Sequence, residues 1–213
     1  MARIKPSIGD RLEGLRDLAQ TDPVNAQDAA WGWMTRLGEL ARDDRPRAVE
    51  QLDRLFADGL PPATIDGPAD GMVVATMFNP GTDVLLRKIG GVWMPWLGKR
   101  FHAASDCGEN RITGGFRVAT RTIWPTYATK PDGANRRGFE FTTRIERGAV
   151  EPAVSVLVID YASMPSNPRR IVPRIRDELV QLVPGTYLGR MLWQRSNGEY
   201  LNVGFFALRG ELA

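Results

Sequence analysis

Two neighbouring residues at the end of an apolar run have the types needed for acid–base chemistry. Asp160 and Tyr161 follow residues 154–159, which are apolar on both faces and therefore predict a strand covered on both sides. One of the two side chains is expected to point into the protein interior. A carboxylate placed there must be paired or have a raised pKa, which is how a general base is made. The alternative is that Asp160 only caps the turn before Pro165.

A second group of reactive residue types is short and incomplete. His102 is the only histidine and Cys107 the only cysteine, with Asp106 beside it. These residue types can ligate zinc, and a Cys–His pair can form a nucleophile, but nothing in the sequence fixes their geometry. The chain has no Gly-x-Ser-x-Gly, phosphate-binding or dinucleotide-binding motif. We predict no metal and no cofactor, and we take Asp160, Tyr161 and His102 as the candidate catalytic residues.

Apolar side chains in the second half of the chain alternate with arginines, so each strand is expected to have one apolar face and one solvent-exposed face. An apolar pocket with a few polar groups is the usual composition of a small-molecule site. The alternative is that these side chains fill a solid core. The candidate ligand-binding residues on the apolar faces are Phe116, Thr120, Trp124, Phe141, Tyr187, Met191, Trp193, Asn202 and Phe206.

The elements that must position these residues fall into two parts. Three amphipathic helices are predicted in residues 1–60, with Ser7 and Asp22 as N-caps, Pro23 at a first helical position and Gly59 as the last stop signal. Each helix has an apolar stripe that must be buried. We predict that this helical cap packs on the outside of a β-sheet unit formed by residues 72–213 and that the two parts form one compact unit.

The sheet unit is predicted from its period-two patterning, which begins near Lys99. Strands are expected at residues 72–78, 111–124, 139–146 and 154–161, and a helix at 83–92. Residues 174–182 fit either a helix or a strand. Asn197-Gly198 between residues 187–193 and 200–208 predicts a hairpin, because Asn-Gly is the strongest short hairpin signal. The fold class is therefore α+β with an antiparallel sheet.

Composition narrows the location and the partners. The net charge is +3, but the arginines are spread along the chain and alternate with acids, so we predict no nucleic-acid partner. One cysteine excludes an intramolecular disulfide, and no apolar leader follows Met1. No apolar run is long enough for a transmembrane segment. We predict a cytoplasmic protein, and its oligomeric state stays open.

The stretch Gly91-Val92-Trp93 resembles the Gly-x-Trp signature of lipocalins and other calycin β-barrels. In that group the tryptophan closes one end of the barrel and a basic residue after the last strand packs on it, a role that Arg209 matches in position and type. Trp96-Leu97-Gly98-Lys99-Arg100-Phe101 is also similar to a run in small Gly-x-Trp-x-Gly barrels. The resemblance implies a lipocalin-like barrel over residues 72–209 with an interior cavity for one small apolar ligand. Some calycin barrels bind haem through one histidine, which would make His102 an alternative haem ligand.

Three functions are compatible with these observations. The first is binding of a hydrophobic small molecule, such as a lipid, pigment or polyketide-like compound, in the barrel. The second is a cofactor-free cyclase or isomerase that holds its substrate in a reactive shape, since positioning alone can lower a barrier by roughly 7–11 kcal/mol. The third is an interaction module without a cavity.

Overall fold

The computed structural model describes residues 7–77, 96–115, 126–169 and 171–212. Its first part is three helices, α1 (Ile8–Thr21), α2 (Pro23–Asp43) and α3 (Arg45–Ala57), as the sequence predicted. Ser7 forms a capping box with Asp10, and the Asp22 side chain accepts a hydrogen bond from the Asn25 amide. Each cap satisfies an amide that the first helical turn leaves without a partner.

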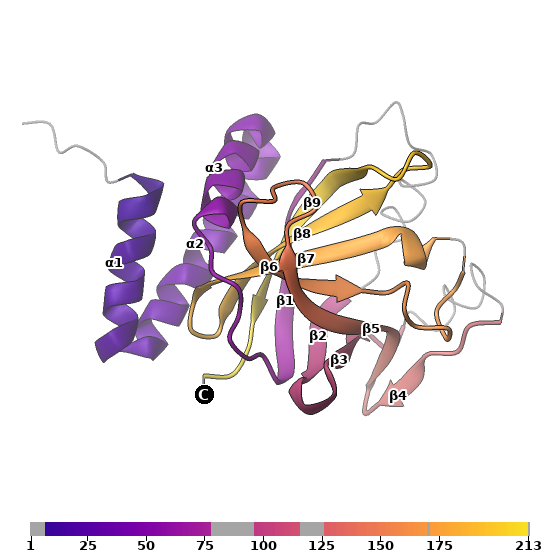
Figure 1. The fold of residues 1–213 in the computed structure, drawn as a ribbon. Coiled ribbons are helices and arrows are strands. Elements are labelled where there is room, and N and C mark those ends of the chain that lie inside the picture. Colours follow the sequence, from indigo (N-terminus) through magenta and orange to yellow (C-terminus); the bar gives the residue numbers. More distant parts are fainter. Residues whose placement is uncertain (1–6, 78–95, 116–125, 170, 213) are drawn as a thin grey trace, which may run out of the picture.

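The described residues also form nine strands, and every pairing between them is antiparallel. The sheet order is β3-β2-β1-β9-β8-β7-β6-β5, and β3 pairs with β5, so eight strands close into a barrel while β4 adds to the side of β5. The fold class is therefore α+β, a closed eight-stranded antiparallel barrel with N-terminal helices alongside (Figure 1). The strands are β1 (Gly67–Thr76), β2 (Trp96–His102), β3 (Cys107–Ile112), β4 (Lys130–Asp132), β5 (Asn135–Arg147), β6 (Ser155–Asp160), β7 (Ile175–Val183), β8 (Thr186–Gln194) and β9 (Tyr200–Arg209).

Most strand predictions are confirmed, and one ambiguity is resolved. The segment that fitted either a helix or a strand is β7, and it pairs with β6 and β8. The predicted hairpin joins β8 to β9, with the Gly198 amide donating to the Arg195 carbonyl. The expected strand at 111–124 is only partly described: β3 ends at Ile112, and residues 116–125 lie outside the described residues. The predicted helix at 83–92 and Gly91-Val92-Trp93 also lie outside them.

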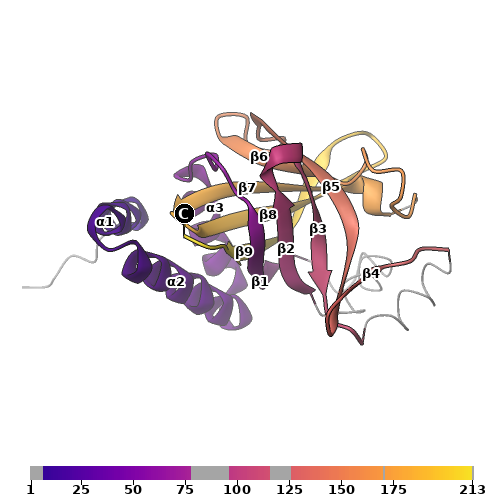
Figure 2. The same ribbon diagram turned by 90° about the horizontal axis from the view of Figure 1, so that it is seen from below.

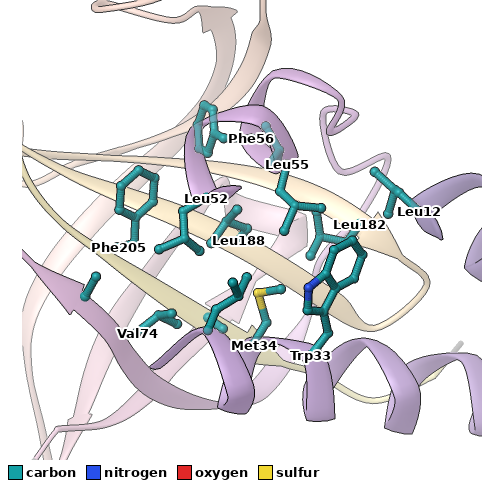
Figure 3. Packing of buried hydrophobic residues seen from close by; sticks show 14 of the residues in the cluster. Leu12, Trp33, Met34, Leu52, Leu55, Phe56, Val74, Leu182, Leu188 and Phe205 are labelled. Carbon is teal, nitrogen blue, oxygen red and sulfur yellow. The ribbon is translucent and has the colours of Figure 1, made fainter. Parts of the chain in front are cut away.

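The helices gather on one side of the barrel and cover the outer face of part of its sheet (Figure 2). Met34, Leu52 and Phe56 from α2 and α3 pack on Leu188 and Phe205 from β8 and β9 (Figure 3). We call this group, with its neighbours, the helix–barrel core. Burying each such side chain contributes roughly 1.5–3 kcal/mol, so this core is a main attachment of the helices to the barrel.

A second group of buried side chains fills the barrel interior. It includes Phe101 of β2, Phe141 of β5, Ile159 of β6, Leu179 of β7 and Phe206 of β9. β6 contributes to both cores, because Val156 and Val158 face the helices while Leu157 and Ile159 face the interior. This confirms the prediction of a strand covered on both faces.

Candidate functional site

Four polar side chains meet inside the barrel. Lys99 of β2, Asn110 of β3, Tyr161 after β6 and Asp177 of β7 are all buried, and Lys99 is only 2% exposed. Each occupies the inward row of its strand, next to apolar residues such as Phe101 and Leu179. We call these four residues the interior polar network.

Lys99 has a partner for every N–H of its ammonium group. Its Nζ donates to Asp177 Oδ2 at 2.8 Å, to the Tyr161 hydroxyl at 2.5 Å and to Asn110 Oδ1 at 3.1 Å. The Tyr161 hydroxyl in turn donates to Asp177 Oδ2 at 2.9 Å. A buried ammonium needs such partners, because leaving it unpaired would cost several kcal/mol.

Asn110 connects the network to the barrel backbone. Its Nδ2 group donates to the Phe139 carbonyl and to the Tyr161 hydroxyl, both at 3.2 Å, and its Oδ1 also accepts from Trp96 Nε1 at 3.0 Å. The Phe139 backbone has φ 52°, a left-handed conformation rare for a large residue, beside an irregularity in the β3–β5 register. Backbone strain of this kind persists only where the surrounding structure holds the residue in place. Here the strained residue is Phe139, whose carbonyl accepts a hydrogen bond from Asn110.

Aromatic rings surround the ammonium on several sides. Lys99 Nζ lies 5.2 Å from the ring centroids of Phe141 and Tyr161, 5.3 Å from that of Phe206 and 5.7 Å from that of Trp96. Cations within about 6 Å of an aromatic face are attracted to it. The site therefore combines one cation, one carboxylate and a phenol in an apolar enclosure.

The enclosure shifts the acid–base properties of the network. Burial lowers the pKa of Lys99, and the nearby Asp177 carboxylate opposes that shift. Burial raises the pKa of Tyr161 well above its ordinary value, and Asp177 adds to the shift. Both shifts favour the neutral amine of Lys99 and the neutral phenol of Tyr161. These two groups and the Asp177 carboxylate are hydrogen-bonded to one another, so protons can pass between them.

One oxygen of the network is left without a donor. Asp177 Oδ1 is buried and has no hydrogen-bond partner, whereas Oδ2 accepts two bonds. An unsatisfied buried acceptor costs roughly 1–3 kcal/mol. A ligand that brings a donor to Oδ1 would recover that free energy.

Inward-facing side chains at one end of the barrel are only half-buried. We call it the Trp96 end, because β2 begins there with Trp96, which is half-buried. Met191 lies directly opposite Asp177, and Trp193 opposite Ile175, so these pairs share the inward face. Ile175, Met191 and Trp193 are also half-buried. A ligand that reaches Asp177 from outside would pass between these side chains.

The three predicted catalytic residues lie on different faces. Tyr161 is in the interior polar network, as the sequence suggested for one member of its pair. Asp160 faces outward, where its carboxylate accepts from Arg144 Nη1 and from the Ala162 amide, both at 2.8 Å. His102 also lies on the outer face, with Nε2 3.4 Å from Glu109 Oε1. The structure therefore does not bring Asp160 or His102 to Tyr161.

The predicted ligand-binding residues divide into three groups. Phe141, Tyr187 and Phe206 belong to the interior cluster. Met191 and Trp193 face inward at the Trp96 end, while Asn202 follows a register shift and its Oδ1 accepts from the Gly204 amide. Phe116, Thr120 and Trp124 lie outside the described residues.

Sequence reasoning missed Lys99, Asn110 and Asp177. A signal was available, since Asp177 sits between Ile175 and Leu179 in one alternating row, and Lys99 shares a row with Phe101. A single polar residue in an apolar inward row marks a buried polar group.

Two hollows on the outer surface complete the candidate sites. One, of about 540 Å³, lies against α1 and is lined by acidic and basic side chains such as Asp10 and Arg16. The other, of about 200 Å³, lies beside β5 and includes Tyr127, Arg137 and Glu140. Both are lined by charged side chains on the outside of the protein, so neither matches the interior apolar pocket expected from the sequence.

The fold tests the resemblance to calycin barrels, whereas the Gly-x-Trp signature at residues 91–93 lies outside the described residues. A closed eight-stranded antiparallel barrel is compatible with a lipocalin-like fold. No family model, curated protein or solved structure matches this chain. Trp93 lies outside the described residues, and Arg209 Nη2 donates to Asp28 Oδ1 at 2.5 Å on the helix side of the barrel. Stacking of Arg209 on Trp93 stays a prediction.

Two further observations bear on partners and metals. Within the described part of the chain, no helix has both the length and the apolar character needed to cross a bilayer. Among the same residues, no three His, Cys, Asp or Glu side chains come together as a metal site would require.

Proposed function

We propose that the barrel binds a hydrophobic small molecule that enters at the Trp96 end and donates a hydrogen bond to Asp177. The observation that carries the proposal is the buried Asp177 Oδ1 atom, which has no partner in an otherwise saturated network. The walls near it are apolar or aromatic, with Phe206 and Trp96 in edge-to-face contact at 5.5 Å. This is the composition of small-molecule sites, in which few polar groups orient a ligand.

The network also selects among ligands. Every N–H of Lys99 already has an acceptor, so an anionic head group would have to break existing bonds to reach the ammonium. A hydroxyl group needs no such exchange, because it meets a free acceptor. An apolar alcohol is therefore a better ligand than a fatty acid of the same length.

A titration with matched compounds tests this proposal. Binding of 1-decanol and of decyl methyl ether, which lacks the donor, is followed by tryptophan fluorescence, since Trp96 and Trp193 lie at the proposed point of entry. A hydrogen bond to a carboxylate is worth roughly 1.5–3 kcal/mol, so the alcohol should bind roughly ten- to a hundredfold more tightly. Equal affinities, or no binding of either compound, would contradict the proposal.

A pair of variants locates the effect. Asp177→Asn removes the charge and should reduce the preference for the alcohol to about threefold or less, because neutral acceptors bind more weakly. Asp70→Asn is the matched control, since Asp70 is an outward barrel carboxylate paired with Arg111 Nη1 at 2.7 Å. The control should keep the full preference. The wild-type comparison of the two compounds stands even where Asp177→Asn is too unstable to use.

A cofactor-free isomerase or cyclase is the second candidate, favoured by the position of Tyr161. Its hydroxyl is hydrogen-bonded to both Lys99 and Asp177 and is buried, and a phenol there can donate a proton to a bound substrate. With a β,γ-unsaturated ketone as probe, Tyr161→Phe should abolish formation of the conjugated isomer and leave binding nearly unchanged. Loss of turnover in Asp160→Asn instead would place the chemistry on the outer face.

A further inference from the structure

The cation of the interior polar network is a lysine in a chain that otherwise prefers arginine. Of 28 basic residues only four are lysines, at positions 5, 88, 99 and 130. Arginine, with its planar fork and permanent charge, suits a purely structural buried ion pair better. Lysine is the residue that can lose its proton when buried and then act as a nucleophile.

We propose that Lys99 condenses with the carbonyl group of an apolar aldehyde or ketone to form an imine inside the barrel. The inference rests on the proposed binding function, because it requires that an apolar ligand reaches Asp177. It adds a second ligand class for the same site, a carbonyl compound, whose carbinolamine has the hydroxyl donor that Asp177 can accept. Three features of the site support it: the proton acceptor beside Nζ, the free oxygen of Asp177 and the aromatic walls.

The first step is proton transfer within the buried pair. The Lys99 ammonium gives a proton to Asp177 Oδ2, 2.8 Å away, which leaves a neutral amine and a neutral carboxylic acid. Burial lowers the pKa of Lys99, because an apolar interior disfavours the charged ammonium group. The amine nitrogen then attacks the carbonyl carbon, and the carbonyl oxygen takes up the amine proton to give a carbinolamine.

The second step expels water. The Asp177 carboxylic acid returns its proton to the carbinolamine hydroxyl, the C–O bond breaks, and water leaves as the C=N bond forms. The products are a protonated imine, a carboxylate and water, so the pair again has one positive and one negative charge. Asp177 Oδ1, which has no partner in the free protein, is the acceptor available to the carbinolamine hydroxyl. The same contact explains why an alcohol should bind.

The surroundings suit the charged product. Lys99 Nζ lies within 5.7 Å of four aromatic centroids, and a protonated imine keeps the positive charge at that nitrogen. Asp177 remains beside it as counter-ion. Tyr161 and Asn110 accept hydrogen bonds from Nζ, so they act as positioning residues for the nucleophile.

Reductive trapping tests the inference directly. The full-length protein is incubated with decanal and cyanoborohydride near neutral pH, and the decyl-modified lysines are mapped by mass spectrometry of proteolytic peptides. Lys99 should be modified at least tenfold faster than Lys130, whose side chain is 64% exposed and bonded to Glu140. Excess 1-decanol should suppress the modification of Lys99 and leave that of Lys130 unchanged.

Variants and matched outcomes separate this inference from simple binding. Asp177→Asn should slow trapping at Lys99 by tenfold or more, while the outer-face control Asp70→Asn should not change it. Lys99→Arg should lose the adduct at this position, and Lys99→Met serves for the same comparison if the arginine is not accommodated. Unmodified Lys99 in a protein that binds the alcohol would overturn the imine and leave the binding function. If neither 1-decanol nor decanal binds, both the imine and the proposed binding function are wrong.

Discussion

At the scale of single residues, the Lys99–Asp177 pair decides how the barrel interior behaves. Moving two charges out of water costs several kcal/mol for each ion, and their attraction offsets this only when further hydrogen bonds satisfy both groups. Lys99 meets that condition with three acceptors, and Asp177 meets it at one oxygen only. The pair is therefore stable as a pair but costly to break.

A double-mutant cycle should reveal this asymmetry. Lys99→Met and Asp177→Leu should each lower the free energy of unfolding by about 3–5 kcal/mol, because each leaves an uncompensated buried charge. The double variant should lose less than either single variant, since it removes both charges. Urea denaturation of the four proteins gives the coupling energy. Additive losses would show that the two side chains do not depend on each other.

The buried tyrosines predict an alkaline limit to stability. Burial raises the pKa of Tyr127 to about 12 and also raises the pKa of Tyr187. Unfolded tyrosines ionise near about pH 10, so above this pH the unfolded chain releases protons that the folded chain keeps. The contribution is fully present below about pH 10 and is lost as the pH rises toward the folded pKa.

We therefore expect the free energy of unfolding to fall between about pH 10 and 12, and to fall less steeply in Tyr127→Phe. The difference between the two proteins, measured by urea denaturation across this range, isolates one tyrosine. This matters because the lowered pKa of Lys99 acts in the opposite direction below its unfolded value of about 10.4. Identical pH slopes for the two proteins would refute the assignment to Tyr127.

At the scale of elements, an extra residue in β2 brings two side chains to the same face. Trp96 pairs with Ile112, but Gly98 pairs with Arg111, so two steps along β2 match one step along β3. This bulge turns both Trp96 and Lys99 inward although they are three residues apart. Asn110, which lies opposite Lys99, can then bind both side chains. The interior polar network depends on this local irregularity.

Gly98→Ala should disrupt the network through the backbone of β2, without replacing any of its four side chains. Gly98 has φ 128°, and a β-carbon there would lie 2.0 Å from the Ala69 carbonyl oxygen, so the backbone of β1 or β2 must move. We expect a loss of at least about 1–3 kcal/mol, the typical cost of such strain, together with faster acetylation of Lys99. Gly14→Ala in α1 is the control, since nothing lies within 4 Å of its β-carbon position and helix propensity favours alanine. An unchanged Lys99 acetylation rate in Gly98→Ala would contradict this role of the bulge.

The same bulge explains which parts of the protein could be predicted from its sequence. The helices are marked by N-cap residues and apolar stripes, and the β8–β9 hairpin is marked by its Asn-Gly turn. Each of these signals lies within a few residues of the element that it predicts. The interior polar network joins strands far apart in the chain, and strict alternation from Lys99 would place Trp96 on the outer face. The sequence singles out Asp160 because it ends an apolar run, yet the inward row of β6 continues to Tyr161. Alternation along the strand predicted that one residue of the pair points inward, and only the strand register could identify which one and its partners.

At the scale of the whole molecule, the helices and the barrel share one core and several ion pairs. Arg190 of β8 donates to Asp53 of α3 at 2.7 Å and to Glu151 at 2.9 Å, and its guanidinium lies 4.0 Å from the Phe56 ring centroid. Gln27 of α2 donates to the carbonyls of Gly185 and Gly210 at the barrel end opposite Trp96. The helices therefore hold strand ends as well as a strand face.

We predict that the helices and the barrel unfold together. Phe56→Ala removes a fully buried ring and its contact with Arg190, and should lower the free energy of unfolding by about 3–5 kcal/mol. Helical circular dichroism and tryptophan fluorescence should lose their native signals in one transition at a reduced denaturant concentration, since the ring belongs to a core shared by both parts. Val24→Ala, at a side chain 56% exposed on α2, should change stability by less than about 0.5 kcal/mol. A variant whose helical circular dichroism is lost first, while its β-sheet circular dichroism keeps the wild-type midpoint, would show that residues 1–60 fold as a separate unit.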